Sequence, residues 1–316
     1  MDKLSIIIPC YNEEESIQLY YDAMQALKQN FKRRVKWEYL FINDGSTDRT
    51  LTELRRLAAQ SDEVRYLSFS RNFGKEAGLY AGLEHATGDY VAVMDVDLQD
   101  PPEMLIDMYE ILKTTDYDCV GTQRTTRKGE SVIRSWFAEN FYRLINKISN
   151  THIVDGARDY RLMTRQMVDA ILQVSEYNRF SKGIFSWVGF KTKYLPYENH
   201  KRQAGETSWN FWSLFLYSID GIMSYSQFPL DLVSILGVVV FLLAVIFALF
   251  FMIRTLFFGN PTSGWTSTIV IILGLGGIQL LSLGIVGKYV GKAYLEVKKR
   301  PIYILKETEE DLKHKE

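Results

Sequence analysis

Cysteine is scarce in this sequence, since Cys10 and Cys119 are the only two among 316 residues. Each lies at the end or the start of an apolar run, a pattern that excludes a disulfide framework and indicates buried thiols in a reducing compartment. Histidine is also scarce, and none of the four histidines has metal-ligand spacing to another histidine or to a cysteine. A Walker-type loop, a Gly-x-Gly-x-x-Gly loop and a Ser-His-Asp arrangement are also lacking.

An excess of charge of either sign is lacking too, because 37 Lys and Arg residues stand against 38 Asp and Glu residues. We predict no nucleic-acid partner. The chain begins directly with an apolar run, Leu4 to Ile8, and lacks a charged region followed by an apolar one, so we expect no cleavable signal peptide. The mean hydropathy of −0.10 conceals an uneven distribution, since the last third of the chain holds nearly all of the lipid-like sequence.

Short apolar runs alternate with helical patterns from Leu4 to about Gln123. The predicted strands are Leu4 to Ile8, Trp37 to Ile42, Val64 to Ser68, Tyr90 to Met94 and Cys119 to Val120. The predicted helices are Glu15 to Asn30, Thr47 to Gln60, Lys75 to Ala86 and Pro102 to Lys113. This alternation is typical of a mostly parallel sheet with helices on both faces, in which ligands bind at the carboxyl ends of the strands.

Asp95, Asp97 and Gln99 directly follow the fourth predicted strand. Two carboxylates and an amide at one sheet edge are hard oxygen ligands, which suit a divalent cation such as Mg²⁺ or Mn²⁺. A cation held by so few protein groups completes its shell with water and substrate phosphates, so we expect a nucleotide diphosphate as the ligand. Taken alone, the same run would also fit an acidic strand-to-helix turn with an Asp cap.

The last third of the chain predicts attachment to a membrane. An aromatic segment, residues 207–228, suits a helix in the membrane interface, although an ordinary packed helix also fits its pattern. Residues 229–292 contain two uncharged stretches, about 232–253 and 266–286, each long enough to cross a hydrocarbon core of about 30 Å. Cations are concentrated after the second stretch, which places the tail, residues 293–316, in the cytoplasm together with the N-terminal domain, residues 1–206. These cations are Lys288, Lys292, Lys298, Lys299 and Arg300, against the single Arg254 in the connecting loop.

Six motifs in order give the chain a resemblance to a known family over nearly its whole length. The motifs are Ile8-Pro9-Cys10-Tyr11-Asn12-Glu13, Asn43-Asp44-Gly45-Ser46-Thr47-Asp48, Ser70-Arg71-Asn72-Phe73-Gly74-Lys75, Asp95-Val96-Asp97-Leu98-Gln99-Asp100-Pro101-Pro102, Asp159-Tyr160-Arg161-Leu162-Met163 and Lys201-Arg202-Gln203-Ala204-Gly205-Glu206-Thr207-Ser208-Trp209. The sequence resembles the membrane-anchored polyprenyl-phosphate glycosyltransferases of family 2, such as bactoprenol glucosyltransferases and dolichol-phosphate mannose synthases. The resemblance implies an α/β nucleotide-sugar-binding domain of the GT-A type, followed by the interfacial helix and a hairpin of two transmembrane helices.

The resemblance also implies roles for individual residues. The residues expected to bind the nucleotide-sugar are Pro9, Tyr11, Glu13, Asp44, Lys75 and Asp95. The expected metal ligands are Asp95, Asp97 and Gln99, and the expected catalytic residues are Asp97 and Asp159. Asp159 fits either a base or a group that orients a substrate, and Asp155 is its alternate. The cations expected to bind the acceptor phosphate are Arg124, Arg134, Lys201 and Arg202, because guanidinium groups match a phosphate well.

We therefore expect an inverting transferase that moves glucose or N-acetylglucosamine from a UDP-sugar to undecaprenyl phosphate, for cell-envelope glycan modification. It would act at the cytoplasmic face of the bacterial cell membrane, in contact with membrane lipids and as a homo-oligomer. One alternative is a processive polysaccharide synthase, which by family would need more spans and a Gln-x-x-Arg-Trp motif that this sequence lacks. The other alternative is a membrane scaffold that has lost catalysis, against which the intact Asp95, Asp97 and Gln99 argue.

Overall fold

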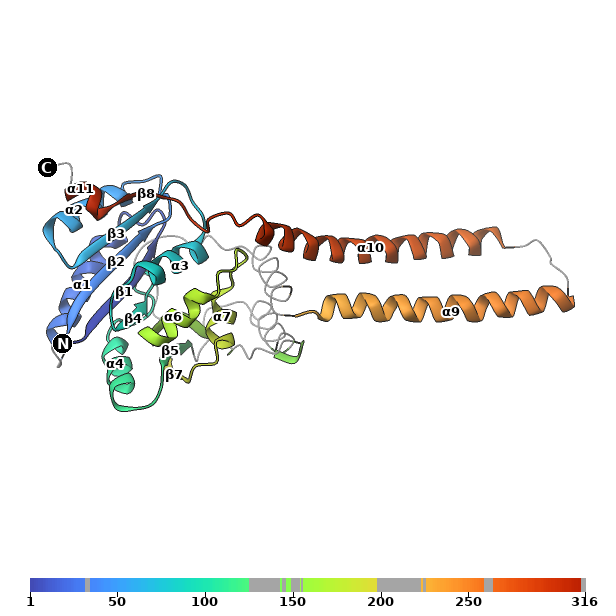
Figure 1. Cartoon of the computed structure of the whole chain (residues 1–316), viewed down its shortest axis with the longest axis horizontal. Helices are drawn as coiled ribbons and strands as arrows, with labels where there is room; N and C mark the ends of the chain where they lie inside the picture. The colour runs from blue at the N-terminus through green and yellow to red at the C-terminus, as the bar shows by residue number, and fades with distance from the viewer. Residues whose placement is uncertain are drawn as a thin grey trace.

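Eight strands form one sheet in the order β7-β5-β6-β4-β1-β2-β3-β8 (Figure 1). The computed structural model describes residues 1–31, 35–124, 156–197, 226–258 and 264–313, together with positions 143, 146–148, 154 and 223. The strands are β1 (Lys3–Cys10), β2 (Lys36–Asn43), β3 (Val64–Phe69), β4 (Tyr90–Val93), β5 (Cys119–Arg124), β6 (Ala157–Thr164), β7 (Thr192–Tyr197) and β8 (Leu305–Thr308). Strands β1 to β4 run parallel to their neighbours in that group, β7 runs parallel to β5, and β6 and β8 are antiparallel to the strands beside them. The predicted mostly parallel sheet is confirmed.

Helices cover both faces of the sheet because successive side chains of a strand point to opposite sides. In β1, Ile6 and Ile8 belong to one buried cluster and Ile7 to the other. The first cluster is completed by α1 (Ser16–Asn30), α2 (Thr50–Gln60) and α4 (Met104–Thr114). The second is completed by α3 (Lys75–His85), α6 (Arg165–Gln173) and α7 (Ser181–Trp187). The near-continuous apolar strands of the sequence are therefore buried on both faces.

Helix α3 lies unusually close to the sheet at Gly82. A Cβ atom at this position would lie 2.1 Å from Cγ2 of Ile7, far inside van der Waals contact. The absence of a side chain at Gly82 therefore allows α3 to approach β1, and this approach sets the position of Lys75 at the start of the helix.

Strand β6 is an element that the apolar pattern did not predict. Its sequence carries Arg158, Asp159 and Arg161 within eight residues, which hides the apolar alternation. Arg161 is nevertheless only 2% exposed. Its guanidinium lies 3.8 Å from the ring centroid of Phe185 and donates to the backbone carbonyls of Arg158 and Asp159. A buried arginine with these partners is compatible with a central strand, and no periodicity reveals such partners.

The segment after the long helices returns to the sheet, where the sequence had indicated only a tail. Strand β8 pairs antiparallel with β3, and α11 (Glu309–Lys313) follows it. Glu307 accepts hydrogen bonds from Arg55 at 2.5 and 2.7 Å and from the Tyr66 hydroxyl at 2.6 Å, and Glu309 pairs with Arg65 at 2.5 Å. These contacts cover the edge that β3 would otherwise expose.

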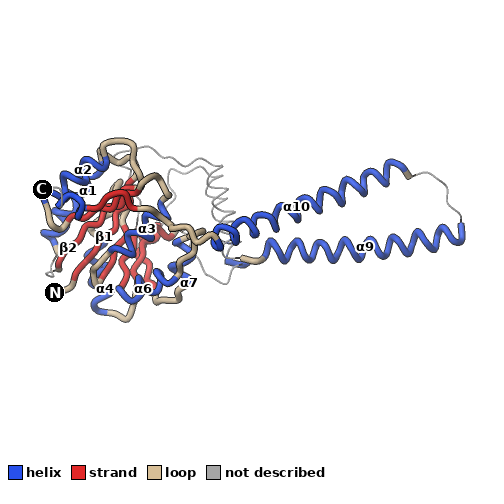
Figure 2. The backbone as a smooth tube through the Cα atoms, turned by 45° about the horizontal axis from the view of Figure 1, so that its top comes forward, coloured by secondary structure: helices blue, strands red, loops and turns tan. Residues whose placement is uncertain are grey.

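Two long helices, α9 (Phe228–Phe258) and α10 (Trp265–Val297), lie side by side and extend away from the sheet (Figures 1 and 2). Apolar side chains are exposed along both, for example Phe241 at 65% and Leu280 at 72%. Among the residues that the structure describes, Phe228–Phe247 is the one helical segment long and apolar enough by length and composition to cross a membrane. The two expected helical stretches are thus helical and longer than predicted. The predicted interfacial helix, residues 207–228, falls almost entirely outside the described residues.

A buried ionic network at the amino ends of the parallel strands provides a test of the fold. Glu38 is 3% exposed and accepts hydrogen bonds from Ser5, Thr87, Lys3 and Arg65. Burial raises the pKa of this carboxyl, but the hydrogen bonds from Ser5, Thr87 and Lys3 outweigh it and lower the pKa from 4.5 to about 2. Such a shift corresponds to about 3 kcal/mol of stability at neutral pH.

We predict that Glu38→Gln lowers the free energy of unfolding by about 3 kcal/mol at pH 7, because it removes the buried charge that accepts from Ser5, Thr87 and Lys3. Since the folded-state pKa is depressed, the wild-type advantage is complete well above the ordinary pKa of 4.5 and shrinks as pH falls from about 5 through the folded-state pKa of about 2. Urea unfolding in detergent, followed by tryptophan fluorescence across this range, measures the effect. Glu53→Gln, which breaks a surface pair with Arg56, is the matched control and should change stability by less than about 1 kcal/mol. Equal stability of wild type and Glu38→Gln at pH 7 would contradict the assignment.

Candidate functional site

Four polar loops meet at the carboxyl end of the sheet because β1 to β4 are parallel and adjacent. In the loop after β4, Asp95 is partly exposed, whereas Asp97 is 7% exposed. Leu98 adopts a left-handed backbone conformation with φ 54°, which reverses the chain so that the Gln99 N–H donates to Asp97 Oδ1 at 3.2 Å. The three predicted metal ligands therefore lie together in one tight turn.

Lys75 joins two of the predicted site residues. Its ammonium lies 2.8 Å from Asp95 Oδ1 and 2.7 Å from Asp159 Oδ2. The Lys75 ammonium therefore links the start of α3 to the loop after β4 and to strand β6. Burial alone would lower the pKa of Lys75, but the carboxylates of Asp159 and Asp95 outweigh it and raise the pKa above its ordinary value. Burial likewise opposes ionisation of Asp159, but the cations Lys75 and Lys182 hold the pKa of Asp159 well below its usual range. Asp159 is therefore a carboxylate in this arrangement.

Asp44 anchors the loop that leads to Lys75. It is 5% exposed, and its two oxygens accept the N–H groups of Phe73 at 2.6 Å and Gly74 at 2.9 Å. Burial raises the pKa of Asp44, and these two hydrogen bonds offset only part of that effect. Next to it, Gly45 has φ 65°, and a Cβ there would lie 2.3 Å from the backbone carbon of Arg71. The loops after β2 and β3 are thus interlocked, so Asp44 holds the loop whatever contact it makes with a nucleotide.

The loop after β1 supplies the remaining residues expected at the nucleotide. Tyr11 is 47% exposed at the sheet edge, as a ring available for stacking requires. Glu13 is turned toward the start of α1, where it accepts from the Ser16 hydroxyl at 2.7 Å. Pro9 is the penultimate residue of β1, beside Gly78 of α3. The structure places all three at the predicted edge, and their contact with a nucleotide stays a prediction.

A polar cluster that sequence reasoning missed lies beside the metal turn. Arg158 donates from Nη2 to Gln99 Oε1 at 3.3 Å and from Nε to the Tyr197 hydroxyl at 3.1 Å, and its Nε lies 3.6 Å from Asp100 Oδ1. The Tyr197 hydroxyl in turn donates to Asp100. Asp100 and Tyr197 are 7% and 8% exposed. The only signal in the sequence was the position of Arg158 immediately before Asp159, and nothing there indicated its partners.

The metal prediction fits the donor set that the structure presents. Within the described part of the chain no group of three or more His, Cys, Asp or Glu side chains is arranged to hold a metal ion. The expected site uses two carboxylates and the amide of Gln99, and a cation there would need further oxygen ligands from a diphosphate and water. Asp95 and Asp97 are also close enough to help raise the pKa of buried Asp100, after burial itself. This concentration of negative charge suits a hard divalent cation.

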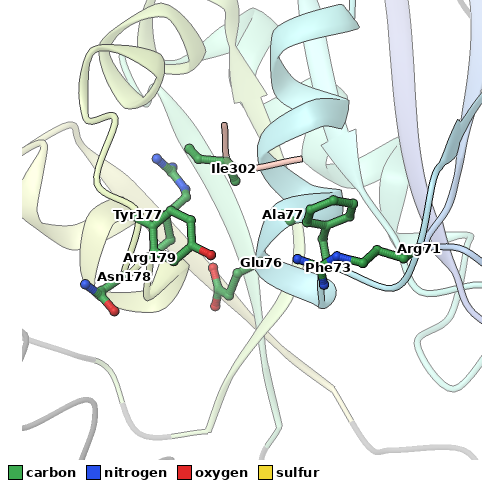
Figure 3. A pocket seen from close by; sticks show the side chains of 8 residues that line it. All are labelled: Arg71, Phe73, Glu76, Ala77, Tyr177, Asn178, Arg179 and Ile302. Atoms are coloured by element: carbon green, nitrogen blue, oxygen red, sulfur yellow. The ribbon is translucent and has the colours of Figure 1, made fainter. Parts of the chain in front are cut away.

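A cavity of about 190 Å³ opens between α3 and the loop that joins α6 to α7 (Figure 3). Glu76 lies in its centre, where it accepts from the backbone and the hydroxyl of Ser181. One wall carries Arg71, and the opposite wall carries Arg179. Ile302, in the segment after α10, closes the cavity from a third direction. The cavity therefore lies where the sheet domain meets the base of α10.

Most of the residues expected to bind the acceptor phosphate lie outside the part of the chain that the structure describes. Arg124 ends β5, and because β4 and β5 are both antiparallel to β6, it lies at the same end of the sheet as the metal turn; its N–H donates to the Gly156 carbonyl at 3.0 Å. Arg134, Lys201 and Arg202 lie outside the described residues, as does Asp155.

Comparison with known proteins identifies similar sequences over nearly the whole chain. The family model for glycosyl transferase family 2 matches residues 5–172. CsbB of Bacillus subtilis (strain 168) is 46% identical over 96% of this chain and 91% of its own length. The SfII prophage-derived bactoprenol glucosyl transferase of Shigella flexneri is 42% identical over 97% of this chain and 98% of its own length. Among solved structures, mannosyl-3-phosphoglycerate synthase from Rubrobacter xylanophilus has a TM-score of 0.47 at 15% identity, covering 70% of this chain and 72% of that one.

The interlocked loops generate a prediction that does not depend on activity. Asp44→Ala removes the acceptor of two N–H groups, so amide exchange at Phe73 and Gly74 should accelerate about tenfold, equivalent to about 1.4 kcal/mol of lost protection. Hydrogen–deuterium exchange read by mass spectrometry measures this. Asp48→Ala is the matched control, since Asp48 accepts from Glu14 and Thr50 and should affect only those amides. Unchanged exchange at Phe73 and Gly74 in Asp44→Ala would show that other contacts hold the loop.

Proposed function

The chain belongs to glycosyl transferase family 2, and from this membership we propose that it transfers glucose or N-acetylglucosamine from a UDP-sugar to undecaprenyl phosphate, with inversion. The observation that carries the proposal is the junction of Lys75, Asp95 and Asp159 beside Asp97, at the edge where the loops expected to bind the nucleotide meet. The similarity to a bactoprenol glucosyl transferase over 97% of the chain supports the lipid phosphate acceptor. The product would be a lipid-linked sugar for cell-envelope glycan modification.

The donor side of the site is assigned to the turn after β4. We assign Asp95, Asp97 and Gln99 to Mg²⁺ or Mn²⁺, which when bound acts as a Lewis acid for the charge that develops on the departing nucleoside diphosphate. Lys75 then has two roles, because its ammonium neutralises Asp159 and can turn toward a donor phosphate when Asp95 binds the cation. The exposed ring of Tyr11 provides a stacking surface for the base.

Asp159 serves in this mechanism as an orienting carboxylate. Lys75 and Lys182 hold the pKa of Asp159 below its usual range, which makes this carboxylate a weak base. A strong base is not needed, because a phosphate monoester with a second pKa near ~6 is already largely dianionic at neutral pH. The oxygen of the lipid phosphate attacks the anomeric carbon, the bond to the nucleoside diphosphate breaks, and no proton has to leave the nucleophile.

The long helices support a reaction at a membrane. In our proposal α9 and α10 cross the bilayer as a hairpin, with α10 contributing a second span beside the apolar segment of α9. Two contacts join the base of this hairpin: the Tyr289 hydroxyl donates to the Ser226 carbonyl at 2.7 Å, and Glu296 accepts the N–H groups of Tyr177 and Asn178, both at 3.0 Å. The first contact holds the start of α9 beside α10, and the second joins α10 to the loop after α6, which supports one cytoplasmic location for the sheet domain and for the segment after α10. The cations Arg124, Arg134, Lys201 and Arg202 stay our assignment for the acceptor phosphate.

A panel of donors tests the function. Membranes that contain the full chain should form a lipid-linked sugar from undecaprenyl phosphate with UDP-glucose or UDP-N-acetylglucosamine but not with GDP-mannose. A chelator should abolish the product, and Asp97→Asn should lower turnover at least about 100-fold. Asp107→Asn, an exposed change on α4, is the control and should keep normal turnover. Full turnover in Asp97→Asn or in chelator would refute the metal assignment, and a preference for GDP-mannose would refute the donor assignment.

Topology provides an independent prediction. After replacement of the buried Cys10 and Cys119, a cysteine at Ser263, between α9 and α10, should react with a membrane-impermeant maleimide on intact cells. A cysteine at the exposed Glu310 of α11 should react only after lysis, because the cations after α10 retain that segment in the cytoplasm. Labelling at Glu310 but not at Ser263 would invert the orientation and deprive the site of its cytoplasmic donor.

A further inference from the structure

The hydrogen bond from Arg158 to Gln99 determines which atom of the Gln99 amide faces the guanidinium. A guanidinium can only donate hydrogen bonds, so the atom of the Gln99 amide that faces Arg158 is its oxygen, at 3.3 Å. An amide oxygen has two lone pairs, and this contact occupies one of them. The other lone pair is left for a cation, and the NH₂ group of the amide is turned away from it.

A cation next to a metal site would ordinarily repel the metal. Here the charge of Arg158 is matched by Asp100, whose Oδ1 lies 3.6 Å from Arg158 Nε and which is 7% exposed. Tyr197 fixes both partners, because its hydroxyl accepts from Arg158 at 3.1 Å and donates to Asp100. The Arg158 guanidinium can therefore direct the Gln99 amide without adding net positive charge to the site.

We propose that Arg158 is a positioning residue, held by Asp100 and Tyr197, that presents the Gln99 amide oxygen to the divalent cation of the donor site. The inference rests on the proposed function, since it needs a cation at Asp95, Asp97 and Gln99. Groups that orient metal ligands in this way typically change metal affinity by about 10-fold to 100-fold when they are removed.

Titration of Mn²⁺ into the full-length protein in detergent, with UDP present and free Mn²⁺ followed by electron paramagnetic resonance, tests the proposal without turnover. Arg158→Gln should raise the Kd for Mn²⁺ about 10-fold to 100-fold, and Arg158→Lys, which keeps the charge and one donor, should raise it less. Tyr197→Phe removes only the hydroxyl, preserves the ring and should raise the Kd by a few-fold. Arg56→Gln, on the exposed side of α2, is the matched control and should leave the Kd unchanged.

Turnover and thermal unfolding separate positioning from a purely structural role. If Arg158 positions a metal ligand, saturating Mn²⁺ should restore most of the turnover lost in Arg158→Gln, and the Tm should stay within a few degrees of wild type. A Kd equal to wild type in Arg158→Gln overturns the inference, and so does a large fall in Tm with a loss of turnover that Mn²⁺ does not restore. Failure of the wild type itself to bind Mn²⁺ with UDP would refute the metal assignment of the proposed function, which distinguishes the two failures.

Discussion

One ammonium group shared by two carboxylates sets the arrangement of the candidate site. Asp95 follows β4 and Asp159 lies in the neighbouring antiparallel strand β6, and without Lys75 between them their charges would repel across a partly buried gap. In formal charges, Asp95, Asp97 and Asp159 together with Lys75 leave two negative charges, while Arg158 and Asp100 cancel each other. The two remaining negative charges suit a divalent cation better than a monovalent one. The position of Lys75 depends in turn on the close approach of α3 at Gly82 and on the loop anchored by Asp44.

The sequence predicted the elements and motifs that depend on residues close to one another in the chain. Strands β1 to β4 and the helices between them follow from apolar spacing, and the parallel order then places their loops at one edge. The ligand turn after β4 was recognised because carboxylates and an amide lie within five residues of one another in the chain. Strand β6 was missed as an element because its charged residues hide the alternation, although its motif was noticed.

The sequence did not indicate the contacts between segments that lie far apart in the chain, and the reason is different. The pairing of Lys75 with Asp159 and of Arg158 with Gln99 depends on which strands become neighbours, and β6 is inserted next to β4 although β5 precedes it in the chain. Charged residues in a sequence show only that partners are needed. Likewise, Glu307 and Glu309 gave no sign that they would meet Arg55 and Arg65 across the edge of the sheet.

The late position of β8 in the chain imposes an order on biogenesis. The ribosome delivers β1 to β7 first, then the two long helices, and only afterwards the strand that completes the edge beside β3 (Figure 1). During synthesis the nascent sheet therefore presents an open edge, a template for pairing with other chains, until the hairpin has been made. If α9 and α10 cross the bilayer as the hairpin proposed above, its insertion would hold both of its ends at one surface, and the returning strand would emerge close to the edge that it must complete. In the proposed topology, membrane insertion would thus be a step in the folding of the sheet domain.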